Sequence, residues 1–352
     1  MSAVAEVAGR RLAALRRYRP GERATAPGGK LSSNESALGP APAVRQAAAA
    51  ADLNLYPTSE PLREALAAAL AVATGQLVLT SGSDELCYLV ATLFIAPARR
   101  VVLSRPCYQI DELVTRLHDG DPVFVDLLPD GHHDLQAMAE AAQDASVLWL
   151  PSPHNPTGAA ADADGIARLL EGVPQDCLVV LDEAYGDYAA RRPDVSALLA
   201  EHPNLLVQRT FSKAYALAGL RIGYGLASPE LIAALDAIRP PFNVNAVAID
   251  AAIAALEHPA WRDYGIELVV RERTRLQAHL DALGFERFDS QANFVTARVP
   301  HADRLHERLA ARGIAVRDGA DLGLEGWTRI SIGAPATMAL VRAALTEHKE
   351  QL

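Results

Sequence analysis

The stretch Leu178-Val179-Val180-Leu181-Asp182-Glu183-Ala184-Tyr185 shows the pattern that decides the fold: a short apolar run that ends in polar side chains. Such a run is typical of a strand that is buried on both faces of a sheet. The pattern recurs along the chain, and Ala- and Leu-rich helical stretches separate the runs. The expected strands are Leu77–Thr80, Val101–Ser104, Val123–Leu127, Val147–Leu150, Leu178–Asp182, Leu205–Thr210 and Ile222–Ala227. Strands that alternate with helices predict an α/β fold with a seven-stranded, mostly parallel sheet covered by helices on both faces.

The sequence changes in character after Pro240-Pro241. A long helical stretch, a strand, a helix and two further strands are expected there: Val247–Leu283, Asn293–Val299, Ala302–Arg312, Ile314–Val316 and Thr328–Ile332. This order predicts a smaller α+β domain. We therefore expect a large domain of residues 41–243, and a small domain of residues 244–352 that is completed by an N-terminal arm, residues 1–40.

Composition excludes several classes of protein. Of the 352 residues, 50% are hydrophobic and 22% charged, which is typical of a globular protein. A formal net charge of -10 argues against a nucleic-acid partner, and no uncharged apolar run is long enough for a membrane span or a secretion signal. The three cysteines, Cys87, Cys107 and Cys177, are widely spaced and odd in number. They predict reduced thiols in a cytoplasmic protein, with neither a disulfide framework nor a metal site.

Lys213 lies in the segment 209-RTFSKAYALAGLRIGY-224, and it is one of only three lysines in a chain with 33 Lys and Arg residues. Arginine stays protonated, whereas a desolvated lysine can act as a nucleophilic amine. A Schiff base with a carbonyl cofactor is the evident use of such an amine. The polar residues that follow the other expected strands support it, because ligands of parallel sheets bind beyond the carboxyl ends of the strands.

Segments in this order along nearly the whole chain resemble the fold-type I pyridoxal-phosphate aminotransferases, in the branch of the histidinol-phosphate and aromatic (phenylalanine) aminotransferases. They are Tyr18–Gly21, Leu31–Glu35, Tyr56-Pro57, Ser81–Glu85, His154–Gly158, Asp182–Tyr185, Arg209–Tyr224, Pro241–Asn245, Ser290–Phe294 and Arg329–Gly333. The resemblance implies pyridoxal 5'-phosphate as cofactor. It also implies a homodimer that exchanges an amino group between an amino donor and a 2-oxo acid such as 2-oxoglutarate, in two half-reactions.

The resemblance also assigns catalytic roles. Lys213 would form the Schiff base and move a proton, and Asp182 would pair with the protonated pyridine nitrogen so that the ring stores electrons. Asp182 follows an apolar strand, where a carboxylate needs a cationic partner; a helix cap is the alternative interpretation. Tyr185 and Asn155 would donate hydrogen bonds to the 3'-oxygen of the cofactor.

The phosphate of the cofactor is expected at Ser83 and Asp84, where small residues open a helix N-terminus. By the same resemblance Thr210, Ser212 and Arg221 complete this phosphate site, and Tyr108 stacks on the pyridine ring. Tyr56 is expected to reach the phosphate in the neighbouring subunit.

The resemblance places substrate-binding residues mainly in the small domain. Arg329 would pair with a carboxylate, and Arg317 together with Tyr18 would face a substrate phosphate. Asn34 and Asn293 are expected near the same end of the site.

Two departures leave the substrate open. Asp111 replaces an aromatic residue of the family pattern and could make the substrate pocket more polar, and Ser36-Ala37 lacks the usual proline. The substrates that the resemblance implies are histidinol phosphate and aromatic amino acids, and these departures do not choose between them. Two alternatives use the same cofactor: a decarboxylase of the threonine-phosphate type, and a non-catalytic cofactor-binding regulator. His132-His133-Asp134 looks like a metal cluster. However, adjacent residues on a strand or turn point to different sides, and no further ligand at a suitable spacing completes a metal site.

Overall fold

A computed structural model of the protein describes residue 4 and residues 19–352. Its larger part is built on a seven-stranded sheet with the order β1-β7-β6-β5-β4-β2-β3. The strands are β1 (Leu77–Thr80), β2 (Arg100–Arg105), β3 (Asp121–Asp126), β4 (Ala145–Pro151), β5 (Leu178–Asp182), β6 (Leu205–Thr210) and β7 (Gly223–Leu226). β7 runs antiparallel to both β1 and β6, and the other pairs are parallel. The predicted fold class is confirmed.

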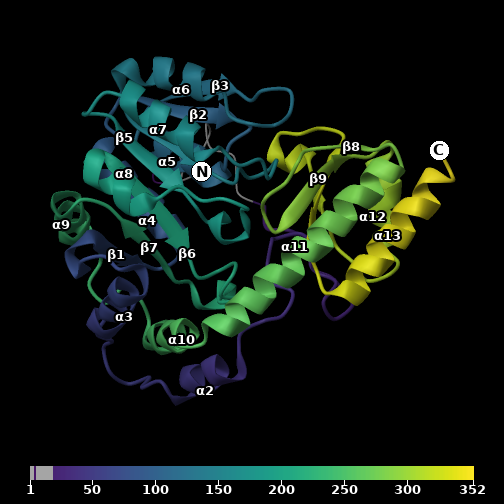
Figure 1. Ribbon diagram of the computed structural model, residues 1–352, viewed down its shortest axis with the longest axis horizontal. Coiled ribbons are helices and arrows are strands. Elements are labelled where there is room, and N and C mark those ends of the chain that lie inside the picture. The colour runs from purple at the N-terminus through teal and green to yellow at the C-terminus, as the bar shows by residue number, and fades with distance from the viewer. Residues whose placement is uncertain (1–3, 5–18) are drawn as a thin grey trace.

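Helices cover both faces of this sheet, as the apolar runs predict (Figure 1). Alternate residues of β5 belong to different hydrophobic clusters, Val179 and Leu181 to one and Leu178 and Val180 to the other. The first cluster includes buried residues of α2 (Pro42–Ala50), α3 (Glu60–Leu70), α6 (Leu135–Ala141), α7 (Ala163–Gly172) and α8 (Val195–Glu201). The second includes residues of α4 (Ser83–Phe94), α5 (Gln109–Leu117) and α9 (Pro229–Ile238).

The smaller part carries a four-stranded antiparallel sheet, β10-β11-β9-β8. Its strands are β8 (Glu286–Arg287), β9 (Phe294–Arg298), β10 (Arg317–Asp318) and β11 (Trp327–Ser331). The helices α11 (Pro259–Ala282), α12 (Ala302–Ala310) and α13 (Pro335–Lys349) pack against it (Figure 1). Tyr185 and Ala214 follow β5 and β6 of the large sheet, and they belong to the same hydrophobic cluster. The turns after these two strands therefore pack against the small sheet.

The expected long helix of residues 247–283 is wrong in one respect, because the structure has two helices there: α10 (Ala246–Leu256) and α11. Pro259 stands in the first turn of α11, where a missing N–H costs nothing, and it cannot continue α10. Buried residues of α10, such as Ala248 and Ala251, belong to the core of the large sheet. This core therefore extends past residue 243, and the division of the chain at that residue stays a prediction.

The segment before α2 crosses to the small sheet. Lys30 forms an isolated bridge with Ala315, and the N–H of Ser331 donates to the carbonyl of Leu31 at 3.0 Å. The expected strand at 314–316 is thus reduced to this bridge, and the paired strand is β10. Within the described residues, no helix is long and apolar enough to cross a membrane.

Candidate active site

Residues from both parts of the molecule surround a cavity of 560 Å³ at the carboxyl ends of the parallel strands. The predicted site residues that line it are Asn34, Ser83, Asp84, Tyr108, Asn155, Asp182, Tyr185, Thr210, Ser212, Lys213, Arg221 and Arg329. Their positions range over nearly 300 residues of sequence. The fold thus brings together most of the residues that the sequence selected.

Lys213 lies on the turn that follows β6. This turn is held by its own hydroxyl groups, because the N–H of Ser212 donates to Thr210 Oγ1 at 3.0 Å and Thr210 Oγ1 donates to Ser212 Oγ at 2.9 Å. Lys213 Nζ lies 3.4 Å from the carbonyl oxygen of Ser33 and 5.5 Å from the centre of the Tyr185 ring. The amine is half-buried and is the one lysine on the cavity wall.

Asp182 ends β5 with its carboxylate at the cavity. The N–H of Ala184 donates to Oδ1 at 2.8 Å, which fixes the orientation of the side chain. Burial raises the pKa of Asp182 to about 6, and the bond from Ala184 opposes that rise. No ion pair of Asp182 occurs among residues 19–352. The carboxylate therefore suits a cationic ligand group.

Backbone N–H groups and one guanidinium group meet at the start of α4. Gly82 precedes this helix with a φ of 77°, and a Cβ there would lie 2.5 Å from Arg221 Nη2. A Cβ on Gly223 would lie 2.6 Å from the backbone nitrogen of Ser83. Arg221 pairs with Asp84 at 3.3 Å. A helix N-terminus joined by an arginine suits a phosphate group.

Tyr108 precedes α5, and its hydroxyl group donates to Asp84 Oδ1 at 3.0 Å. This bond ties the ring to the beginning of α4. The side chain therefore lines the cavity close to the start of α4.

The other end of the cavity is formed by residues of the small sheet and the N-terminal segment. Arg329 is 5% exposed; Nη1 donates to Asn155 Oδ1 at 2.6 Å and Nη2 to the carbonyl of Ser32 at 3.0 Å. Arg317 is equally buried and stands opposite Arg329 in the pairing of β10 with β11. Both arginines line a small separate pocket of 30 Å³, which shares Asn155, Tyr108 and Arg329 with the lining of the cavity.

A chain of amides and hydroxyls holds Asn34 in place. Asn34 has a φ of 57°, and its Nδ2 donates to the Tyr185 hydroxyl oxygen at 3.0 Å. Ser331 Oγ donates to Asn34 Oδ1 at 2.8 Å, and Asn293 Nδ2 donates to the Asn34 carbonyl at 2.9 Å. Asn293 is fully buried behind Asn34 and is not part of the cavity wall. Its link to the cavity is therefore indirect, through its bond to Asn34.

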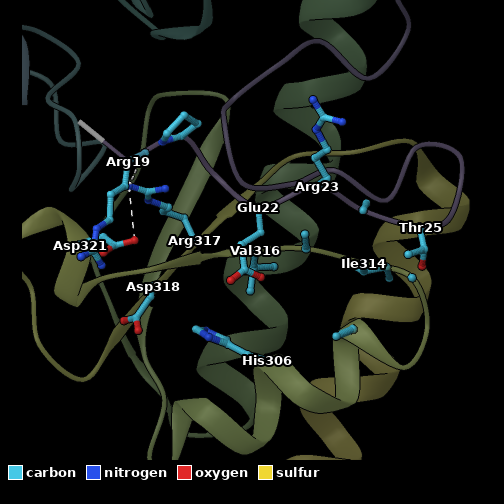
Figure 2. Close-up of a pocket in the computed structure, with 15 residues that line it drawn as sticks. Arg19, Glu22, Arg23, Thr25, His306, Ile314, Val316, Arg317, Asp318 and Asp321 are labelled. Atoms are coloured by element: carbon cyan, nitrogen blue, oxygen red, sulfur yellow. Dashed lines mark hydrogen bonds and ion pairs between the residues drawn. The ribbon is translucent and has the colours of Figure 1, made fainter. Parts of the chain in front are cut away.

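Arg317 also lines a second cavity, which has a volume of 380 Å³ and whose lining residues are drawn in Figure 2. Arg317 Nη2 donates to the carbonyl of Arg19 at 2.7 Å and lies 3.4 Å from Asp321 Oδ2. Arg317 thus lines both this second cavity and the small pocket beside Arg329. Tyr18, its expected companion, lies outside the described residues.

Tyr56 is not part of the cavity of its own chain. Its side chain is 82% exposed and stacks on Phe242 with ring centres 4.5 Å apart. A contribution to a neighbouring subunit stays a prediction.

Asp111 does not line the cavity, although the sequence suggested an effect on pocket polarity. It is 3% exposed and faces Cys87, whose Sγ lies 3.8 Å from Asp111 Oδ1. The sequence alone missed both this contact and Gln208, which is hydrogen-bonded to Asp182. The register of two parallel strands pairs Gln208 with Asp182, and no motif marks it.

The histidines near the site hold loops. His133 Nε2 lies 2.8 Å from the carbonyl of Pro151, and His154 Nδ1 lies 2.9 Å from Thr157 Oγ1. Burial lowers the pKa of His133 to about 4. In the described part of the chain, no three His, Cys, Asp or Glu side chains are grouped as metal ligands would be.

Comparison with known proteins gives concordant results. A family model described as aminotransferase class I and II matches residues 28–347. Histidinol-phosphate aminotransferase 1 of Thiobacillus denitrificans is 40% identical over 325 residues, which cover 90% of this chain and 84% of that one. The crystal structure of histidinol-phosphate aminotransferase from Sinorhizobium meliloti in complex with pyridoxal-5'-phosphate has a TM-score of 0.85 at 31% identity, covering 94% of this chain and 92% of that one. L-threonine-O-3-phosphate decarboxylase from Porphyromonas gingivalis has a TM-score of 0.77 at 27% identity, covering 91% and 99%.

Proposed function

The chain belongs to the aminotransferase class I and II family, and on this premise we propose that its amino donor is histidinol phosphate and its acceptor a 2-oxo acid such as 2-oxoglutarate. The protein is a pyridoxal-phosphate-dependent aminotransferase of the histidinol-phosphate aminotransferase branch. The choice of substrate rests on one observation, the pair of buried arginines Arg317 and Arg329 that line a small pocket, of which Arg329 also lines the cavity.

The arginine pair suits both half-reactions. Histidinol phosphate brings a phosphate group to this end, and 2-oxoglutarate brings carboxylates. A guanidinium group binds either anion through two parallel hydrogen bonds. Both side chains are held in place beforehand by backbone carbonyls, Arg317 by Arg19 and Arg329 by Ser32. Little rotamer entropy therefore remains to be lost when the anion binds.

The residues of the cavity fit pyridoxal phosphate. When bound, this group supplies a carbonyl for the amino group and a ring that stores the electrons freed at the substrate carbon. The desolvated carboxylate of Asp182 fits the cationic ring nitrogen, and the start of α4 with Arg221 fits the phosphate.

We assign the remaining roles to atoms of the chain. Lys213 is the residue that would bind the carbonyl group of the cofactor covalently through Nζ, with loss of water, and as a free amine it would act as the base and acid that moves the substrate proton. Tyr185 and Asn155 would hold the 3'-oxygen of the cofactor by hydrogen bonds and so orient its ring. Because Asn155 also accepts from Arg329, the position of the ring is linked to the anion-binding end.

The likeness to the threonine-phosphate decarboxylase keeps a second reaction in view, since its substrate would bring both a phosphate and a carboxylate to the same arginines. The direction in which the carboxylate projects from the ring decides between the two reactions. Release of CO2 from O-phosphothreonine without any need for a 2-oxo acid would identify decarboxylation.

We further infer that the active unit is a homodimer in the cytoplasm. Leu53, Leu55, Tyr56 and Phe242 are large apolar side chains that stay exposed in the single chain. A second copy of the chain that covers these side chains would place Tyr56 of the first copy at the cavity of the second. The three cysteines are unpaired, which suits a reducing compartment.

The decisive test is a single-turnover experiment with the loaded protein, in which histidinol phosphate and phenylalanine are mixed separately. Absorbance reports the conversion of the cofactor from its aldehyde to its amino form. We expect conversion at least about tenfold faster with histidinol phosphate, because one charge-assisted contact contributes about 1.5–3 kcal/mol. Preference for phenylalanine would show an aromatic aminotransferase instead.

A further inference from the structure

Three buried side chains form a line that leads away from Asp182, the proposed pyridine-binding carboxylate. Gln208 on β6 is 1% exposed and hydrogen-bonds Asp182 on the neighbouring strand. Cys87 on α4 follows, with Sγ 3.5 Å from Gln208 Oε1. Asp111 on α5 ends the line, with Oδ1 3.8 Å from the same sulfur. Two acids are thus joined by an amide and a thiol.

The charges that act on Asp111 within the described part of the chain are those of two other acids. Among residues 19–352 no arginine or lysine pairs with it. The negative charges of Asp182 and Asp84 raise the pKa of Asp111, and Asp84 is itself paired with Arg221. The charge of Asp111 would also act on the thiol groups of Cys87 and Cys107, whose pKa values it would raise.

Charged groups on the other elements that pack against α5 are engaged elsewhere. The charged residues of β2 and β3 all lie at strand ends: Arg100, Arg105, Asp121 and Asp126. Arg100 pairs with Asp144, and Arg105 lies over the Phe124 ring near Asp126. Within α5, Glu112 pairs with Arg116. Burial, followed by the charge of Asp182, raises the pKa of Asp111 well above its usual range.

The count of hydrogens gives the line a direction. Cys87 carries one S–H, yet three acceptors are within its reach: Ser83 O, Asp111 Oδ1 and Gln208 Oε1. If Asp111 is protonated, its O–H donates to the sulfur, the S–H donates to Gln208 Oε1, and Gln208 Nε2 donates to Asp182. Every link then has one donor and one acceptor, and the negative charge lies on Asp182.

We propose that Asp111 is a neutral carboxylic acid at physiological pH and that, through Cys87 and Gln208, it keeps the single negative charge of this cluster on Asp182. This inference rests on the proposed role of Asp182. Asp111 is a positioning residue, since it touches neither the cavity nor a ligand in it.

The arrangement has a consequence for the site. A second buried carboxylate charge would repel the charge of Asp182 and favour its protonated form, which cannot hold a cationic ring nitrogen. A neutral acid keeps the charge count that an aromatic side chain at position 111 would give. The departure from the family pattern at this position therefore leaves the charge of the site unchanged.

The test is carbon-13 NMR of the protein without cofactor, labelled at the side-chain carboxyl carbon of aspartate. The D111N and D182N variants identify the two signals by their loss. We expect Asp111 at the chemical shift of a protonated carboxyl at pH 7, with no change between pH 5 and 8, and Asp182 titrating near pH 6. An ionised Asp111 at pH 7 overturns the proposal.

The variants supply a second, independent arm. Asn replaces a neutral acid without a change of charge, so in D111N the midpoint of Asp182 should stay within about 0.3 pH units. A fall by about one unit or more would mean that a negative charge had been removed, and the proposal would be wrong. Q208M, which removes the donor, should raise the midpoint of Asp182 by about one unit. If D111N does not fold, C87S identifies the Asp111 signal by displacing it.

These measurements separate the inference from the proposed function. Failure of the proposed role of Asp182 would appear as unchanged affinity of D182N for pyridoxal phosphate, whatever the state of Asp111. Failure of the inference alone would leave D182N impaired and Asp111 ionised.

Discussion

The two ends of the active-site cavity are built by different means. At the end that is proposed to bind the cofactor phosphate, called the phosphate-binding end below, Gly82, Thr210, Ser212 and Arg221 are held by contacts around α4, β6 and β7. At the opposite end, Arg317 and Arg329 are held by the carbonyls of Arg19 and Ser32, about 300 residues away in sequence. The first end belongs to one sheet, whereas the second depends on three segments that meet. We therefore expect changes at the first end to affect chemistry, and changes at the second to affect which substrate binds.

The largest effect is expected from Lys213→Ala. Loss of the nucleophilic amine removes both the covalent link and the proton carrier, so kcat should fall at least about ten-thousandfold. Cofactor should still bind, because the anion-binding groups are unchanged, and its absorbance should shift to that of the free aldehyde. Lys349→Ala, at a helix end far from the cavity, is the matched control and should be fully active. Measurable turnover by the Lys213 variant would remove this lysine from the mechanism.

Asp182→Asn should have the next largest effect. The amide cannot hold a positive charge on the ring nitrogen, and kcat should fall about a hundred- to thousandfold, as when one electrostatic contact to the reacting group is removed. KM for the amino donor should change little, since the arginines at the other end are untouched. Steady-state kinetics with both substrates varied separates these terms, and a rise in KM alone would contradict the assignment.

The same substitution should stabilise the protein when no cofactor is bound. Burial raises the pKa of Asp182 to about 6, above its value of roughly 4 in the unfolded chain. The folded state therefore binds more protons between these values, and stability falls as pH rises from about 4 to 6. At pH 7.5 the free energy of unfolding of apo D182N should exceed that of the wild type by about 2–3 kcal/mol, with the difference vanishing near pH 4. Urea denaturation at both pH values checks this, and an equal difference at both would point to a packing effect.

Arg317→Lys tests the other end of the cavity. Lysine keeps the charge but loses the two parallel bonds to an anion. KM for histidinol phosphate should rise about tenfold to thirtyfold, with kcat nearly unchanged, because a charge-assisted bond contributes about 1.5–2 kcal/mol. Turnover of phenylalanine, which has no phosphate, should change less than about threefold. The same loss with both donors would show that Arg317 acts through the fold, by its bond to Arg19.

How far the sequence could predict each end follows from the same contrast. The bounds of β5 and β6 agree with the apolar runs Leu178–Asp182 and Leu205–Thr210, because a strand buried on both faces is apolar along its length. The polar residues after these strands were expected at the site because ligands of parallel sheets bind beyond the carboxyl ends of the strands, and the family resemblance supplied their roles. In contrast, the bond between Asn34 and Tyr185 joins residues 151 positions apart, and no local pattern encodes it. Asp111 shows a further limit, since the rotation of α5 turned the side chain away from the cavity.

Tyr56→Phe should have the smallest effect and tests whether a second subunit completes the phosphate-binding end. The ring keeps its stacking on Phe242, so only the hydroxyl is lost. If this group reaches the neighbouring phosphate, the Kd for pyridoxal phosphate should rise about tenfold, in line with the lower end, about 1.5 kcal/mol, for a hydrogen bond to a charged group. Tyr264→Phe, also at an exposed tyrosine, is the control and should leave Kd unchanged. Mixed dimers sharpen the result, in which one subunit carries Lys213→Ala and the other Tyr56→Phe. If Tyr56 reaches the neighbouring site, one site of such a dimer lacks both wild-type groups and the other site has both. An unchanged Kd in Tyr56→Phe would mean that each chain binds the phosphate with its own residues alone.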